Sequence, residues 1–407
     1  MSKPKIRFKG YEEDWEQRKL GDVTELKSAS RVHKGEWTDS GVPFFRSSDV
    51  MAAINGTTNE KAYISEELYE KLSNASGKLE EGDVLVTGGG SVGNPYIVPN
   101  NEPLYTKDAD LLWIKNQGRF YPYFLYEYFF SPTFRIYLSS ISHVGTIAHY
   151  TITQLSETPI SLPDIEEQIK VGEYFESLDR LITLHQRKCE ETKKLKKYML
   201  QKMFPQNGKR VPEIRFAGFT DDWEQRKLPE FVTFFNGLTY TPDDVEETGT
   251  LVLRSSNVKN GEIVDADNVY VNDKVVTSEN VQEGDIIVVV RNGSRALIGK
   301  HAQIKAPMPN TVIGAFMSGI RSEHSSFVNA LLDTSAFENE IAKNMGATIN
   351  QITGYMFSKM EFMIPSGEEQ QKIGEYFQSF DDLITLHQRK YEELQKIKKF
   401  MLQNMFI

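Results

Sequence analysis

EEQIKVGEYFESLDRLITLHQRKCEETKKLKKYMLQKMF, residues 166–204, returns 202 residues later as EEQQKIGEYFQSFDDLITLHQRKYEELQKIKKFMLQNMF, residues 368–406, with 28 of 39 positions identical. A second repeat lies at the start of each half: IRFKGYEEDWEQRKL at residues 6–20 returns as IRFAGFTDDWEQRKL at residues 214–228. Between these repeats the halves hardly match. A repeated frame around two divergent inserts predicts one structural unit that is used twice to present two different surfaces.

The repeated 39-residue stretch has the pattern of a long helix. It contains no proline, and its one glycine (Gly172, Gly374) lies in the first turns. Apolar residues recur at steps of three and four, as in a coiled-coil seam, and such a helix extends about 58 Å. The predicted helix-pairing positions are Phe175, Leu178, Ile182, His185, Cys189, Thr192, Met199 and Met203, and in the second copy Phe377, Phe380, Ile384, His387, Tyr391, Leu394, Met401 and Met405.

The simplest way for two such helices in one chain to bury their apolar seams is to pack against each other. Each helix follows its own insert, and two equivalent halves favour a two-fold arrangement, which makes the helices antiparallel and places the inserts at opposite ends. A parallel pair, with both inserts at one end, is the alternative. The predicted fold class is α+β: two similar mixed α/β domains joined by two long antiparallel helices that form a coiled coil, with a pseudo-two-fold internal repeat. The predicted divisions are residues 1–165, 166–204, 205–367 and 368–407.

Both inserts show the same order of elements. Each has a strand that ends in an arginine turn, PFFRSSDV from Pro43 and LVLRSSNV from Leu251, and a strand after an EGD turn, at Glu81 and Glu283. A helix-like apolar run follows, at residues 121–140 and 325–345. The shared order predicts one fold used twice.

Composition limits the possible functions. The 407 residues are enough for two or more domains, and 39% hydrophobic residues are ordinary for a globular protein. The N-terminus has no apolar run of a secretory signal, no stretch is long enough to span a bilayer, and the single cysteine, Cys189, fits a reducing cytoplasm. A net charge of −10 is not that of a protein that binds nucleic acid unaided, so local basic loops or a partner must neutralise phosphates.

Gly88–Gly93 satisfies the G-x-G-x-x-G pattern, with Asp108 and Asp110 about twenty residues on, as in a dinucleotide or methyl-donor site. The proline-rich segment after it cannot be the helix that such a site needs, and the other half lacks the pattern. A surface loop is therefore preferred to a cofactor site.

The same loops carry side chains suited to base edges, because arginine matches guanine and asparagine matches adenine. The alternative is a solvated polar turn. The candidates are Thr87, Ser91 and Asn94 in the first half, and Arg291, Asn292, Ser294 and Arg295 in the second.

Further DNA-binding candidates occur at matching places in both halves. Arg46-Ser47 and Arg254-Ser255 make either a phosphate contact or a structural ion pair, and the structural role is preferred. His143, Thr146, Asn344 and Thr348 surround glycines at the end of a helical run and are candidates for contact with the DNA backbone. Thr151 and Thr353 are interpreted as helix caps, and Trp15 and Trp223 as core residues.

No catalytic or metal site is predicted. His185 and His387 occupy the same seam position without cysteine or acidic partners at ligand spacing, so packing is preferred to metal binding. The sequence has no phosphate-binding loop and no nucleophile elbow.

The chain resembles the specificity subunit of type I restriction–modification enzymes. The resemblance lies in the DWEQRKLGDV entry segment and in the long helices that begin LPDIEEQ and IPSGEEQ and continue to LITLHQRK. It implies that the inserts are target recognition domains, that each reads one half of a bipartite sequence in double-stranded DNA, and that the helices fix the spacing of the halves.

The same resemblance implies the partners and cofactors. Two methyltransferase (modification) subunits would dock on the helices, and restriction or motor subunits would complete the complex. We expect no cofactor in this chain; S-adenosylmethionine, ATP and Mg²⁺ belong to the partner subunits. The alternatives are a coiled-coil scaffold with two protein-binding heads and a self-sufficient methyltransferase.

Overall fold

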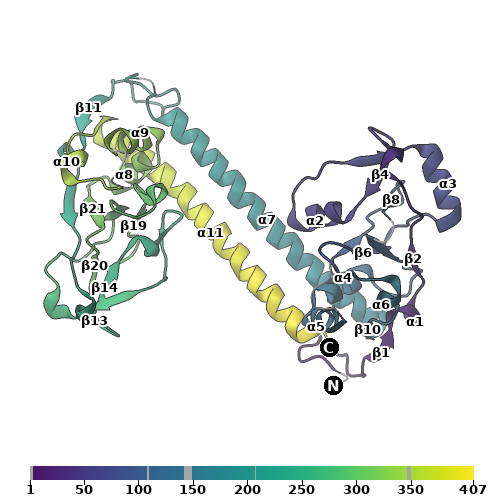
Figure 1. Cartoon of the computed structure of the whole chain (residues 1–407). Helices are drawn as coiled ribbons and strands as arrows, with labels where there is room; N and C mark the ends of the chain where they lie inside the picture. The colour runs from purple at the N-terminus through teal and green to yellow at the C-terminus, as the bar shows by residue number, and fades with distance from the viewer. Residues whose placement is uncertain (1–2, 108–109, 142–148, 207, 346–349) are drawn as a thin grey trace. The chain divides into compact units, whose positions relative to one another are not determined.

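The computed structural model describes residues 3–107, 110–141, 149–206, 208–345 and 350–407. It divides into two compact units: residues 1–185 with 389–407 form unit 1, and residues 186–388 form unit 2. The predicted long helices are present as α7 (Ile165–Met203) and α11 (Gly367–Met405), and each contributes one part to unit 1 and the other to unit 2 (Figure 1).

The two helices run antiparallel within each unit. In unit 1 the ring centroids of Phe175 and Phe406 lie 5.8 Å apart, and Lys398 Nζ lies 2.6 Å from Asp179 Oδ1. As the residue numbers rise along α7, the numbers of the C-terminal residues that contact it therefore fall. Unit 2 shows the same order, because Cys189 faces Gln388 and Phe204 faces Phe377. The predicted antiparallel direction is confirmed within each unit, and the coiled-coil packing stays a prediction.

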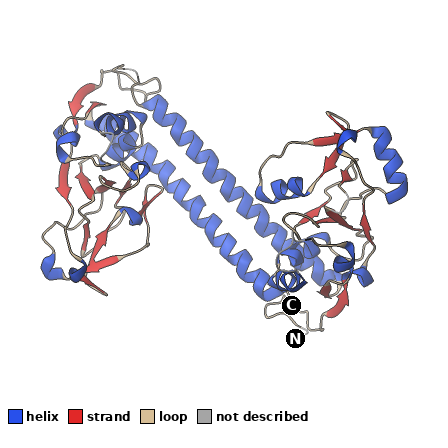
Figure 2. Cartoon of the chain, in the orientation of Figure 1, coloured by secondary structure: helices blue, strands red, loops and turns tan. Residues whose placement is uncertain are grey.

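The described residues of unit 1 form three sheets. The first has the order β2-β9-β6-β7, the second β3-β5-β4-β8, and β1 pairs with β10. Figure 2 shows the strands in red. Their bounds are β1 Glu16–Lys19, β2 Leu26–Ser28, β3 Trp37–Thr38, β4 Val42–Phe45, β5 Ala62–Ile64, β6 Val84–Thr87, β7 Pro95–Ile97, β8 Tyr105–Thr106, β9 Leu111–Ile114 and β10 Pro159–Leu162.

Unit 2 repeats these sheets strand for strand. The orders are β12-β21-β18-β19 and β13-β17-β14-β20, with β11 paired to β22 and an added hairpin of β15 and β16. The bounds are β11 Glu224–Lys227, β12 Thr233–Asn236, β13 Val245–Glu246, β14 Thr250–Leu253, β15 Val258–Lys259, β16 Glu262–Ile263, β17 Val269–Val271, β18 Ile286–Val289, β19 His301–Gln303, β20 Thr311–Ile313, β21 Met317–Arg321 and β22 Glu361–Ile364. The prediction of one fold used twice is confirmed.

The connections differ more than the sheets. After the arginine turn, unit 1 has a helix where unit 2 has a short turn and the added hairpin. The unit 1 helices are α1 Leu20–Val23, η1 Lys34–Glu36, α2 Ser47–Asn55, α3 Glu66–Ser76, α4 Pro122–Phe130, α5 Pro132–Ile141 and α6 Ile152–Ser156. Those of unit 2 are η2 Leu228–Glu230, η3 Pro242–Asp244, η4 Ser255–Asn257, η5 Asp273–Val275, η6 Arg295–Leu297, α8 Ser325–Leu332, α9 Ser335–Asn344 and α10 Gly354–Phe357.

Each predicted helical run is in fact two helices. Residues 121–140 divide into α4 and α5 because Pro132 cannot donate a hydrogen bond within a helix, and the Ser131 hydroxyl bonds back to the Tyr128 carbonyl. Residues 325–345 divide into α8 and α9 at Thr334, whose hydroxyl accepts from the amide of Phe337.

The last aromatic residue of each repeat lies in a domain core. Phe204 packs with Trp223, Phe327 and Phe377 in unit 2, and Phe406 packs with Trp15, Phe124 and Phe175 in unit 1, where α11 ends beside α4 and α5 (Figure 1). Both tryptophans are buried, as predicted. Among the described residues no helix has the length and apolarity needed to span a membrane.

Candidate nucleic-acid interface

The glycine-rich segment of unit 1 is the turn between two antiparallel strands. β6 pairs with β7 so that Val86 lies opposite Pro95, and residues 88–94 connect them. Gly93 adopts a left-handed φ of +75°, and a Cβ there would lie 2.7 Å from Leu138 Cδ2. The strand after the turn agrees with the surface-loop interpretation, since a phosphate-binding site of the Rossmann type needs a helix there.

Several polar side chains of this turn form hydrogen bonds within the protein. Thr87 is buried; its hydroxyl donates to the Ser91 carbonyl and accepts from the amide of Asn94 at 2.9 Å. The Asn94 side chain donates to the same carbonyl and accepts from Arg135 at 3.1 Å. Ser91 is exposed. These bonds give the turn a defined shape.

The matching turn of unit 2 presents larger side chains. Arg291, Ser294 and Arg295 are exposed, while the Asn292 amide donates to the Ser255 hydroxyl at 3.0 Å. The Asn292 side chain also accepts from the amide of Ser294 at 2.9 Å, which orders the turn. The guanidinium of Arg291 lies 5.0 Å from the ring centre of Phe316, which is not among the predicted candidates.

Backbone hydrogen bonds show which residues of the two turns correspond. The residue after β6 is Gly88, which donates to the Asp110 carbonyl at 2.7 Å. The residue after β18 is Val290, which donates to the Phe316 carbonyl at 3.0 Å. Asp110 and Phe316 each directly precede the strand that pairs with β6 or β18. Gly89 with Asp110 in unit 1 therefore corresponds to Arg291 with Phe316 in unit 2.

The shared arginine turns contain ion pairs. Arg46 Nε lies 3.0 Å from Asp49 Oδ2, and Arg254 lies 2.6 Å from Asp267. Ser47 donates to the Asp110 carbonyl at 2.9 Å. The geometry supports the preferred structural role of the two arginines, while contact with DNA stays a prediction.

In unit 2, the arginine turn and Phe316 line one hollow of about 680 Å³. Arg254, Ser255 and Phe316 line it together with Tyr240. Because Asn292 binds Ser255 and Arg291 packs on Phe316, these two residues of the turn lie beside the arginine turn.

Several candidates are not placed by the structure. His143, Thr146 and Thr348 lie outside the described residues, and the side chain of Asn344 is not described. The predicted caps are confirmed: Thr151 and Thr353 accept hydrogen bonds from the amides of Gln154 and Met356.

The helix-pairing positions differ in burial. Phe175, Leu178, Phe377 and Phe380 are buried, whereas Ile182, His185, Ile384 and His387 are half-buried. Cys189 is buried, with Sγ 3.6 Å from the Gln388 side-chain oxygen, which confirms its packing role.

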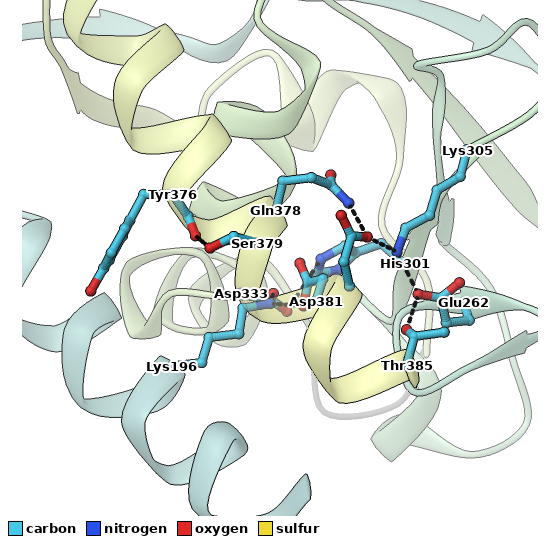
Figure 3. Close-up of polar contacts among 11 residues, drawn as sticks. Lys196, Glu262, His301, Lys305, Asp333, Tyr376, Gln378, Ser379, Asp381 and Thr385 are labelled. Carbon is cyan, nitrogen blue, oxygen red and sulfur yellow. Dashed lines mark hydrogen bonds and ion pairs between the residues drawn. The ribbon is translucent and has the colours of Figure 1, made fainter. Parts of the chain in front are cut away.

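A lysine forms a charged cluster at the same seam position of each helix. In unit 2, Lys196 Nζ lies 2.5 Å from Asp333 and 2.6 Å from Asp381 (Figure 3). Burial opposes ionisation of Asp333, but the hydrogen bond from His301, with Nε2 3.4 Å away, and the charge of Lys196 lower its pKa on balance. The cluster joins both long helices to the residue that follows α8.

The corresponding cluster of unit 1 has a different third member. Lys398 Nζ lies 2.6 Å from Asp179 and 2.8 Å from Glu127, which is inside α4. Glu127 is fully buried, and its Oε2 has no hydrogen-bond partner among the described residues. Burial raises the pKa of Glu127 to about 8 against the charge of Lys398. The clusters attach the helix pair to α4 in unit 1 and to the end of α8 in unit 2.

Comparison with known proteins decides the family. Residues 12–194 and 220–396 each match the type I restriction modification DNA specificity domain. The chain belongs to this family. It is a specificity subunit of a type I restriction–modification system, and it carries two DNA specificity domains.

Individual relatives agree with this assignment. The chain is 22% identical over 400 residues to the type I restriction enzyme MjaVIII specificity subunit of Methanocaldococcus jannaschii, covering 95% of this chain and 91% of that protein. The putative MjaX specificity subunit of the same organism is 24% identical over 403 residues, covering 95% of this chain and 91% of that protein. The fold is similar to the S subunit of M. genitalium, with a TM-score of 0.68 and 15% identity over 100% of this chain and 99% of that one.

The sequence contained a signal for the two lysine clusters of this specificity subunit. Equivalent seam positions recur every seven residues. The position seven residues after Cys189 is Lys196, and the position seven residues after Tyr391 is Lys398. A charged residue at one seam position, repeated in both copies, indicates a specific buried ion pair. Phe316 had no such signal, because its role depends on the register of β21 against β18.

Proposed function

We propose that each specificity domain reads one half of a bipartite sequence in double-stranded DNA, and that α7 and α11 set the distance between the halves. The observation that carries this proposal is a shared backbone with unlike tips. Equivalent positions hold Gly89 and Asp110 in one domain, and Arg291 and Phe316 in the other. Two domains that share a backbone fold but carry different polar side chains at their tips are suited to two different DNA sequences.

The length of the helices supports their role in spacing. A helix of 39 residues extends about 58 Å, and recognition elements on one face of DNA are separated by about 34 Å per helical turn. An insertion of seven residues keeps the seam in register and adds about 10 Å, which is about three base pairs.

The spacing experiment inserts one heptad into both helices and maps methylated sites in a host that expresses the complete system. We expect both half-sites to persist while the unread spacer grows by about three base pairs. An unchanged spacer would refute the role in spacing. A wild-type methylation pattern without two separated half-sites would refute the bipartite reading itself.

Exposed apolar residues on the helices support the docking of two identical partners. Unit 1 exposes Leu181, Ile397 and Phe400, and unit 2 exposes their counterparts at an offset of 202, Leu383, Leu195 and Tyr198. In each helix these residues immediately precede seam positions. In an antiparallel pair such positions adjoin one another, so each unit offers one apolar patch of the same design. Two equal patches fit two copies of a methyltransferase subunit.

The stoichiometry is testable by charge insertion. We expect Phe400→Glu to leave one methyltransferase subunit bound, and Phe400→Glu with Tyr198→Glu to leave none, as measured by native mass spectrometry of the purified complex. Lys399→Glu is the control, because this neighbour is exposed and polar. If the double variant retains two partners, the patches are not the docking sites.

We further propose that the complex acts in the cytoplasm with its restriction or motor subunits, and that S-adenosylmethionine, ATP and Mg²⁺ bind to the partners. The role of specificity subunit supports this division of labour. Calorimetric titration of S-adenosylmethionine into the purified chain and into its complex with the methyltransferase tests it. Binding by the chain alone would contradict the proposal.

A further inference from the structure

An arginine on an aromatic ring distinguishes the tip of the second specificity domain from that of the first. Phe316 is 54% exposed although it directly precedes the buried start of β21. Its carbonyl accepts from the amides of Val290 and Arg291 at 3.0 and 3.2 Å, so the ring and the guanidinium start from fixed backbone positions. The guanidinium then lies 5.0 Å from the ring centre, within the range of a cation–π contact.

Arg291 has no acidic partner at ion-pair distance among the described residues, in contrast to the arginine turn beside it. Arg254 is bound to Asp267 at 2.6 Å, while the contact of Arg291 with an aromatic face leaves its N–H edges available. A planar guanidinium whose position is restricted by stacking loses less freedom when it makes a bidentate contact. Guanine O6 and N7 form the base edge in the major groove that matches such a fork.

The first domain presents different chemistry at the same place. Gly89 has no side chain, and a Cβ added there would lie 3.1 Å from Asp110 Oδ1. Asp110 is in turn ion-paired with Lys107. The second domain therefore has an arginine guanidinium on an aromatic ring where the first domain has a carboxylate and a glycine.

We propose that Arg291, held by Phe316, reads a guanine in the half-site of the second specificity domain. This inference rests on the proposed function and names one base of the target. The ring of Phe316 restricts the guanidinium. The hydrogen bond of Asn292 to Ser255 holds the shape of the turn that carries Arg291.

The experiment uses the complete system in a methylation-deficient host, with sites mapped by single-molecule sequencing. Arg291→Gln is expected to relax one guanine of one half-site, with discrimination reduced about 5- to 150-fold, while the other half-site and the spacer stay unchanged. Phe316→Ala is expected to weaken discrimination at the same base by about 2- to 5-fold, because only the stacking is lost.

The control is Lys372→Ala. Lys372 lies 4.9 Å from the ring of Phe219, and the corresponding pair of unit 1 is Lys170 on Tyr11 at 5.0 Å. A cation–π pair present in both halves belongs to the frame, so its loss leaves the recognised sequence unchanged. Thermal unfolding of the three variants verifies that each is folded.

Binding assays of the reconstituted complex separate base reading from phosphate contact. If Arg291→Gln lowers affinity equally for all sequences and reduces the salt dependence of binding, Arg291 contacts phosphate and the inference is wrong. An unchanged recognition sequence likewise overturns it. If the wild-type complex shows no bipartite recognition at all, it is the proposed function that fails.

Discussion

Replacement of Lys398 by methionine tests whether its ionic cluster holds the helix pair to the first domain. The lysine side chain is 17% exposed and contacts Glu127, which is fully buried, and Asp179, which is 29% exposed. Removing one partner of a buried ion pair costs about 3–5 kcal/mol when the remaining group is charged. Because the pKa of Glu127 is raised to about 8, the experiment is run at about pH 9, where this carboxyl group is ionised. Since Asp179 retains access to water, we expect about 3 kcal/mol, at the lower end of that range.

This loss of stability is large enough to measure in urea. With a slope of about 1–3 kcal/mol per molar urea, the midpoint for unit 1 falls by about 1–3 M. Hydrogen exchange of peptides from α4, followed by mass spectrometry at increasing urea, reports unit 1 separately from unit 2. Lys399→Met, at an exposed neighbouring position, is the matched control.

Two further variants complete the test. The double variant Lys398→Met with Glu127→Gln removes the buried carboxylate as well, so we expect most of the lost stability to return. If Lys398→Met and Lys399→Met show the same midpoint, the cluster contributes nothing and the reasoning fails.

Three other predictions concern unit 1 and its counterpart. Because the folded pKa of Glu127 is raised to about 8, its contribution to stability is complete below about pH 4 and is lost as pH rises toward 8; Glu127→Gln should remove this slope in urea titrations at several pH values. Gly93→Ala should lower the melting temperature more than Gly90→Ala, since both have positive φ but only Gly93 lacks space for a Cβ, with a cost of about 1–3 kcal/mol; equal shifts would contradict this. Phe406→Ala should cost about 3–5 kcal/mol in unit 1 and leave unit 2 unchanged, while Phe204→Ala should do the reverse, as hydrogen exchange would show.

The features of the fold that recur in the sequence were predictable from it. The long helices follow from a repeated period without proline, and the two strands after the EGD turns follow from continuous apolar runs. The division of residues 121–140 into two helices was also accessible, since Pro132 lies inside the run. Local chemistry decided each of these elements.

The candidate site was less accessible because it depends on strand register. Arg291 stood out as a donor in a turn, but Phe316 joins it only because β21 pairs with β18. In the same way, the burial of Glu127 beside Lys398 joins residues 271 positions apart. Sequence period identifies helices and strands, whereas pairs of this kind are fixed by tertiary structure.

The position of Phe406 has a consequence for folding during synthesis. Trp15 leaves the ribosome about 390 residues before its core neighbour Phe406, an interval of about 20–80 s at usual elongation rates. Unit 2 is a continuous segment, residues 186–388, and has its whole core available earlier. Unit 1 is therefore translated first but completes its core last, because its aromatic residues cannot complete their packing until Phe406 has been synthesised.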